Sequence, residues 1–208
     1  MAYDFKKADR QLYRPTSKPA LIDVPQMQFI TASGHGDPNQ EGGQYQQCLQ
    51  QLYTVAYTIK MSKMGSHEIA DYFDFVVPPL EGFWWQPGVK GVDYSHKERF
   101  HFISAIRMPD FVTPDVLAWT VEEAARKKKV DCSAVQLTTI TEGKCAQIMH
   151  VGPYDDEPAT IAKLQQFVDD QGLQLDYSDQ RHHHEIYLSD PRRVKPERMK
   201  TVIRIPVK

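Results

Sequence analysis

The sequence has 208 residues, of which 41% are hydrophobic, 11% aromatic and 25% charged. This length is enough for a buried core in one domain or two small ones. The 25 Lys and Arg against 27 Asp and Glu give a net charge of −2, which favours neither nucleic-acid phosphate nor an anionic membrane. No apolar run approaches the ~20 residues of a transmembrane helix, so we expect a soluble, cytoplasmic protein.

The first elements are an arm, a strand and a helix. Residues 1–20 combine basic residues with prolines and lack periodicity, which predicts an irregular arm. Alternation around Met27 and Phe29 predicts a strand that stops in the Gly- and Asp-rich segment 33–39. Beyond it, side chains with three-four spacing predict a helix whose apolar face holds Tyr45, Cys48, Leu49, Leu52, Ala56 and Ile59.

The middle of the chain predicts two strands and a second helix. Residues 72–77 and 99–106 have strand composition, and a Pro- and Trp-rich connection over 78–88 separates them. Thr113 before Pro114 is typical of a helix start, and the following helix ends in a basic run.

The last third resembles the first in outline. A strand over 146–151 precedes a helix that ends at Gly172, and strands follow over 185–188 and 201–206. Setting Gly34 against Gly152 aligns the two series and places 75–78 against 185–188. We therefore predict an α+β fold of duplicated strand-helix-strand-strand units. The two pseudo-repeats, about 21–108 and 133–208, are joined by a helix in a single domain over 21–208. Their antiparallel sheets would leave helix-free faces to form a central ligand cleft.

Three segments in this arrangement resemble the GyrI-like small-molecule-binding superfamily over about residues 20–207. They are HVGPYDDE at 150–157, EIYLSDP at 185–191 and LEGFWW at 80–85. The resemblance implies a drug-binding pocket, used in that family by multidrug-sensing regulators, by a gyrase-inhibitory protein and by stand-alone hydrolases of cyclopropane-bearing DNA-alkylating natural products. The residues before the first predicted strand are too few for a helix-turn-helix, so we expect no regulator and no direct nucleic-acid contact.

Two acidic residues and a tyrosine are the catalytic candidates. Strand alternation places Glu185 and Tyr187 on one face and Ile186 and Leu188 on the other. We expect the apolar pair to pack against the helices and Glu185 to face the cleft, where the resemblance implies a ligand-contacting glutamate. Aromatic surroundings would raise its pKa and make it a better base. Glu157 is the second acidic candidate, with favourable charge near a helix N-terminus as its alternative role, and Tyr154 is a candidate hydrogen-bond donor.

Aromatic residues are the candidates for ligand binding. Trp84 and Trp85 come first because they fall in the predicted loop bounded by Pro and Gly, with anchoring of that loop as the alternative. Tyr187, Tyr53, Tyr57 and Phe111 complete the candidate set. Stacking on such rings would bind a flat polyaromatic molecule with little loss of side-chain entropy.

Other chemistries find little support in the sequence. Consecutive strand residues alternate faces, so His182, His183 and His184 cannot converge on one metal ion. The Gly34–Gly36 turn lacks the pattern of a phosphate-binding loop, no GxSxG motif occurs, and the three cysteines lack metal spacing. We therefore predict that the protein uses neither a metal nor a cofactor.

The expected function combines binding with hydrolysis. Glu185 would deprotonate a water that attacks the cyclopropane of a cyclohexadienone-type alkylating agent, while a hydrogen-bond donor stabilises charge on the distant carbonyl. Two alternatives remain open: a protein that sequesters drugs without turnover, and a protein that interacts with DNA gyrase or another partner.

Overall fold

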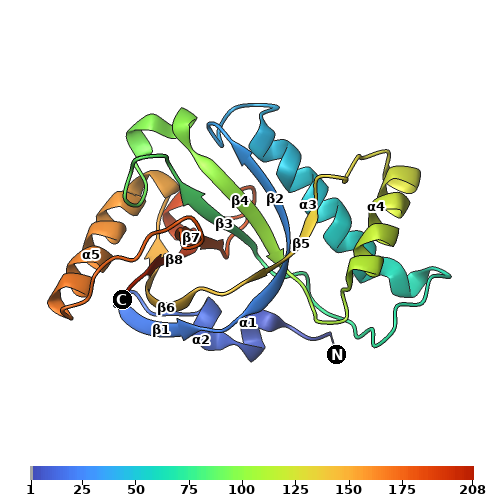
Figure 1. Cartoon of the computed structure of the whole chain (residues 1–208), viewed down its shortest axis with the longest axis horizontal. Helices are drawn as coiled ribbons and strands as arrows, with labels where there is room; N and C mark the ends of the chain where they lie inside the picture. The colour runs from blue at the N-terminus through green and yellow to red at the C-terminus, as the bar shows by residue number, and fades with distance from the viewer. Residues whose placement is uncertain (1) are drawn as a thin grey trace.

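The computed structural model describes residues 2–208 and contains one eight-stranded antiparallel sheet with helices around it (Figure 1). Its strands are β1 (Ala20–Val24), β2 (Met27–His35), β3 (Leu80–Trp85), β4 (His101–Arg107), β5 (Gln136–Ile140), β6 (Gly143–Val151), β7 (His183–Tyr187) and β8 (Lys200–Pro206). Its α-helices are α1 (Phe5–Ala8), α2 (Arg10–Tyr13), α3 (Gln44–Met61), α4 (Pro114–Lys128) and α5 (Glu157–Asp170). Short 3-10 turns are η1 (Ser62–Met64), η2 (Tyr94–Arg99), η3 (Tyr154–Asp156) and η4 (Pro196–Arg198).

The strand order β1-β6-β8-β7-β3-β4-β2-β5 makes the duplication visible. The unit β2-α3-β3-β4 is followed by a second unit, β6-α5-β7-β8, with the same succession of elements. The last strand of each unit lies between its other two, and the units join where β3 pairs with β7. Two strand-helix-strand-strand units thus build one continuous sheet, which confirms the predicted fold class.

The long helices of the two units cover the same face of the sheet on either side of its centre (Figure 1). α3 packs on β2 and β4 through an apolar stripe of Leu52, Val55, Ala56 and Ile59. α5 packs on β6 and β8 through Ile161, Leu164 and Val168. The central strands β3 and β7 are therefore left between the two helices on this face.

The helices start and end as the sequence predicts. The Thr113 hydroxyl accepts a hydrogen bond from the Val116 backbone N–H at 3.3 Å, with Pro114 as the first residue of α4. Gly172, just beyond α5, has a φ of +67°, which glycine adopts without a steric penalty.

The strand predicted over 72–77 is wrong, and so is the loop predicted over 78–88. In the structure, Phe75 makes only an isolated bridge to Tyr3, whereas Leu80–Trp85 forms the central strand β3. β3 lacks alternation because both of its faces are buried, and its internal Gly82 looked like a turn signal. The correct partner of β7 in the duplication is therefore β3 rather than the segment 75–78.

The amino-terminal arm is not irregular. Of its described residues, 5–8 and 10–13 form α1 and α2, which lie below the curled sheet in Figure 1. Phe5, Leu12 and Tyr13 are buried in the main core. The arm is therefore packed onto the core through these three side chains.

Candidate functional site

β7 places its side chains on two faces, as the sequence predicts, but the faces are exchanged relative to our expectation. Glu185 pairs in register with Ile203, which packs against α5, so Glu185 lies on the helix-covered face. Ile186 pairs with Val202 on the opposite face, in the core shared with the arm. Glu185 therefore lies between α3 and α5 rather than on a helix-free face, because the two units join edge to edge and form one sheet.

Three donors surround the carboxylate of Glu185. Oε1 lies 3.0 Å from the Tyr94 hydroxyl and 3.0 Å from His183 Nε2, and Oε2 accepts a hydrogen bond of 2.8 Å from the Tyr187 hydroxyl. Only 7% of Glu185 is exposed, so these donors replace water around its charge. Such a set stabilises the ionised form of the carboxyl group.

Glu157 faces Glu185 across a single hydroxyl. It is the first residue of α5 and is fully buried. Its Oε2 lies 3.0 Å from the same Tyr94 hydroxyl, and its Oε1 has no hydrogen-bond partner. One O–H cannot donate to two carboxylates at once, so the second short contact needs a further proton. The geometry therefore fits a pair in which Glu157 is the protonated member.

The pKa shifts of the pair agree with this assignment. Burial, and then the charge of Glu185, raise the pKa of Glu157 well above its ordinary value. Burial would also raise the pKa of Glu185, but hydrogen bonds led by that from His183 outweigh burial and lower it. The raised pKa that we expected for Glu185 is thus found at Glu157, because the donors gather around Glu185.

Contacts of the segment around Tyr94 with Gln86 and Asp155 hold Tyr94 in place. The buried Gln86 amide donates hydrogen bonds of 2.9 Å to the backbone oxygens of Asp93 and His96 on either side of Tyr94. Lys97 forms an ion pair of 2.8 Å with Asp155 in the turn before α5. Burial and the two glutamates raise the pKa of Tyr94, so its hydroxyl remains a donor.

Four aromatic residues form an aromatic enclosure around the two carboxylates: Tyr45, Trp84, Tyr154 and Tyr187. Trp84 Nε1 donates a hydrogen bond of 2.9 Å to the Tyr187 hydroxyl, and the Trp84 ring centroid lies 5.4 Å from that of Tyr45 on α3. Tyr154 packs edge-on against Tyr187 at 5.7 Å, and burial raises its pKa to about 12. Of the predicted site residues, the structure thus brings Glu185, Glu157, Tyr154, Tyr187 and Trp84 together.

Trp85, Tyr57 and Phe111 lie elsewhere, whereas Tyr53 lies near enough to Tyr45 and Tyr154 to interact electrostatically with both. Trp85 points to the opposite face of β3 and stacks on His182 with ring centroids 4.3 Å apart. Tyr53 and Tyr57 line a surface groove of about 1010 Å³ between α3 and α4. Phe111 is buried against Tyr72, Phe73 and Phe75.

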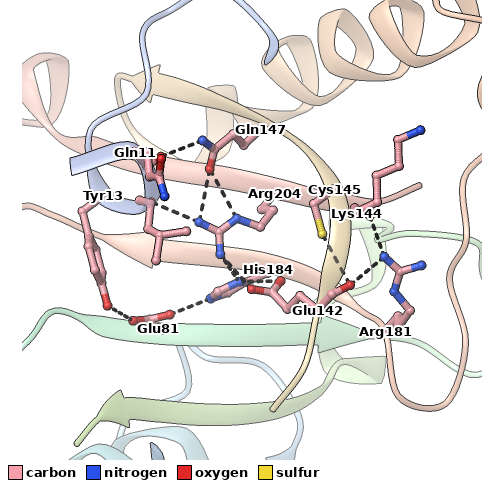
Figure 2. Close-up of polar contacts among 11 residues, drawn as sticks. Gln11, Tyr13, Glu81, Glu142, Lys144, Cys145, Gln147, Arg181, His184 and Arg204 are labelled. Atoms are coloured by element: carbon pink, nitrogen blue, oxygen red, sulfur yellow. Dashed lines mark hydrogen bonds and ion pairs between the residues drawn. The ribbon is translucent and has the colours of Figure 1, made fainter. Parts of the chain in front are cut away.

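The histidine run is divided between the two faces of β7. His183 contacts Glu185, whereas His184 points the other way into a buried polar network (Figure 2). There His184 Nδ1 lies 2.9 Å from Glu142 and Nε2 lies 3.0 Å from Glu81. Across residues 2–208, no group of three or more potential ligands is arranged to hold a metal ion.

Sequence reasoning missed Tyr94 and His183. His183 carries a local signal, because it lies two residues from Glu185 on the same strand and so shares its face. Tyr94 carries none, because it lies in an irregular segment 63 residues from Glu157 and 91 from Glu185 in the chain.

The fold and site define an α+β domain with a tyrosine-bridged carboxylate pair inside an aromatic enclosure. The family model of the GyrI-like small molecule binding domain matches residues 17–208 of this sequence. The chain therefore belongs to the GyrI-like small-molecule-binding family.

Solved structures support this assignment. A hydrolase from Listeria innocua is 48% identical, with a TM-score of 0.90 over 99% of this chain and 100% of that chain. An uncharacterized conserved protein from the same organism is 49% identical, with a TM-score of 0.93 and the same coverage. The EcmrR C-terminal domain shares the fold, with 13% identity and a TM-score of 0.57 over 92% of this chain and 97% of that domain.

Two further findings concern curated proteins and membrane-spanning helices. Comparison with curated proteins finds none that matches this sequence. Within residues 2–208, no helix combines the length and apolar character needed to cross a membrane.

Proposed function

We propose that this protein binds hydrophobic polyaromatic small molecules between α3 and α5 and hydrolyses the cyclopropane of DNA-alkylating cyclopropanoid compounds. The observation that carries the proposal is the pair of buried carboxylates, Glu157 and Glu185, bridged by Tyr94. An acid and a base side by side can move protons in both directions during the addition of water. The similarity to a Listeria hydrolase supports a hydrolytic reaction.

Glu185 is the general base in this mechanism. Glu185 is ionised and keeps 7% of its surface exposed, whereas Glu157 is fully buried, so we assign the contact with the incoming water to Glu185. Glu185 takes a proton from this water as the water oxygen bonds to the cyclopropane methylene. The adjoining ring C–C bond breaks, and its electron pair moves into the cyclohexadienone, which becomes aromatic.

Charge then develops on the distant carbonyl oxygen, which must gain a proton to become a phenol. The tyrosines of the enclosure are the hydrogen-bond donors for that oxygen, and Glu157 is the store of the proton that they relay. The proton that Glu185 received restores the pair after product release. The net reaction is therefore addition of one water to the substrate.

The enclosure also favours the substrate class. The half-buried rings of Tyr45 on α3 and Tyr154 before α5 are the stacking partners that we assign to a flat molecule. A pair that shares one proton keeps a single negative charge, which disfavours anionic ligands. Hydrolysis of an alkylating agent in this enclosure would remove it before it reacts with DNA.

The first test is multiple turnover by purified protein with excess cyclopropanoid, followed by absorbance and mass spectrometry. Glu185→Gln keeps the shape of the side chain and removes the base, so we expect the rate of water-adduct formation to fall by at least about 10²-fold. Glu197→Gln, at an exposed position of η4, is the matched control and should retain the wild-type rate.

Other outcomes separate the alternatives. Stoichiometric binding without product would indicate a drug-sequestering protein that uses the same enclosure. Gyrase inhibition that persists in Glu185→Gln, with no binding of the cyclopropanoid, would indicate action through a surface. Equal turnover by wild type and Glu185→Gln would reject Glu185 as the base.

A further inference from the structure

Tyr94 contacts Glu157 and Glu185 at the same distance of 3.0 Å, so this bridge alone does not decide which of them is ionised. The difference lies in the other partners. Glu157 has an oxygen without a partner, whereas Glu185 gains Tyr187 on one oxygen and His183 on the other. Of these two additional donors, only the imidazole of His183 can also carry a positive charge.

His183 is poorly explained as a packing residue. It is fully buried, and its Nδ1 has no hydrogen-bond partner, which costs free energy in a protein interior. The buried His150 differs, since its ring nitrogens lie 2.8 Å from the Thr160 hydroxyl and 3.0 Å from the Pro153 backbone oxygen. Among residues 2–208, the one side-chain hydrogen bond of His183 is that to Glu185.

We propose that His183 is a positioning residue that holds Glu185 as the ionised base and thereby leaves the shared proton on Glu157. This inference rests on the proposed function for its catalytic consequence, but the protonation of the pair can be measured without substrate. Nε2 carries the proton in this contact, because an ionised carboxylate only accepts hydrogen bonds. His183 acts through Glu185 and does not contact the reacting atoms.

The groups that titrate around this contact come from five elements. Tyr94 from η2 and Glu157 from α5 lie on one side, and Tyr187 belongs to β7 itself. Burial, together with the charge of Glu185, raises the pKa of Tyr45 on α3 and of Tyr154 in η3, so both lie near this contact. The phenols stay protonated near neutral pH, so the two glutamates carry the shared proton of the site.

The test replaces His183 by Phe, which fills similar space and removes the donor. Selective carboxyl ¹³C labelling of glutamate follows the Glu185 titration by NMR, with Glu185→Gln identifying its signal. We expect the Glu185 midpoint to rise by about one to two pH units in His183→Phe, because a hydrogen bond to the charged form is lost. His183→Gln keeps an N–H donor and should restore most of this shift.

Kinetics give the second readout. In wild type, activity should fall as the pH drops through the lowered pKa of Glu185. In His183→Phe, this acidic limb should move to higher pH, while KM changes by less than about threefold because the substrate does not contact His183. His182→Gln is the control, since His182 is the neighbouring residue and stacks on Trp85 on the opposite face.

The outcomes are distinguishable. A Glu185 midpoint that is the same in wild type and His183→Phe would overturn the role of His183, whether or not the protein is a hydrolase. A shifted midpoint without any hydrolysis by wild type would retain that role and reject the proposed function. If Phe prevents folding, His183→Leu removes the same donor from a smaller side chain and carries the same expectation.

Discussion

Tyr94 occupies a position where two carboxylate oxygens compete for one hydroxyl proton. Without this hydroxyl, Glu157 and Glu185 would face each other inside a protein interior, where repulsion between like charges is strong. The bridge therefore lets the two groups lie close together. In the proposed mechanism, the hydroxyl of Tyr94 is therefore needed for the pair to act as an acid and a base.

Tyr94→Phe should lower kcat/KM for hydrolysis by about 10²-fold, the loss expected when a donor at a developing charge is removed. Steady-state kinetics with the cyclopropanoid substrate measure this effect. Tyr177→Phe is the matched control, because the Tyr177 hydroxyl is also buried but has no hydrogen-bond partner. Equal rates for wild type and Tyr94→Phe would contradict a role for the bridging hydroxyl.

β3 shows how one strand positions the enclosure. A Cβ atom on Gly82 would lie 2.5 Å from Trp84 Nε1 and 2.9 Å from the Tyr187 hydroxyl. Both distances are shorter than van der Waals contact, so glycine leaves the space in which Trp84 and Tyr187 form their hydrogen bond. Gly82 also pairs in register with Glu185, at the junction of the two units.

Gly82→Ala should therefore break the Trp84–Tyr187 hydrogen bond and lower the free energy of unfolding by about 1–3 kcal/mol through overpacking. Tryptophan fluorescence and denaturant unfolding measure the two effects. Gly65→Ala is the control, because its φ of −105° suits alanine and the added Cβ would approach only the Ser62 oxygen, at 3.4 Å. A Gly82→Ala protein with unchanged fluorescence would show that the enclosure is more plastic than this geometry implies.

At the scale of the whole molecule, the buried network in Figure 2 joins the arm to the sheet. Arg204 on β8 donates hydrogen bonds to Glu142 at 2.7 Å and to the Leu12 backbone oxygen at 3.0 Å. Although burial opposes ionisation of Glu142, the charges of His184 and Arg204 lower its pKa to about 2. This network supports β7 from behind, directly opposite the face that bears Glu185.

Arg204→Met should lower the free energy of unfolding by about 3–5 kcal/mol, because it removes the fully buried partner of an ion pair in which the Glu142 side chain is only 10% exposed. Thermal and urea unfolding measure this change. Arg192→Met is the matched control, because Arg192 pairs with Asp190 on the surface, and it should leave the unfolding midpoint unchanged. A small effect of Arg204→Met would mean that the other contacts between arm and sheet, such as the hydrogen bond from Tyr13 to Glu81, are sufficient to hold them together.

Sequence periodicity by itself predicted the three long helices, most strands and the duplicated unit, because each rests on local spacing. The family resemblance rested on three short motifs, at 80–85, 150–157 and 185–191. Periodicity also placed Glu185 and Tyr187 on one face, since strand alternation needs no tertiary information. Periodicity did not reveal β3, because both faces of this strand are buried and its apolar and polar residues therefore do not alternate.

Only the tertiary structure decided which face of β7 the helices cover and which distant groups meet there. Alternation groups side chains into two sets, but the direction of each set depends on how β3 and β7 join the units. The meeting of Tyr94, Glu157 and Glu185 depends on contacts between segments far apart in the chain. No local pattern encodes such contacts, so the proton-sharing pair follows from packing rather than from sequence spacing.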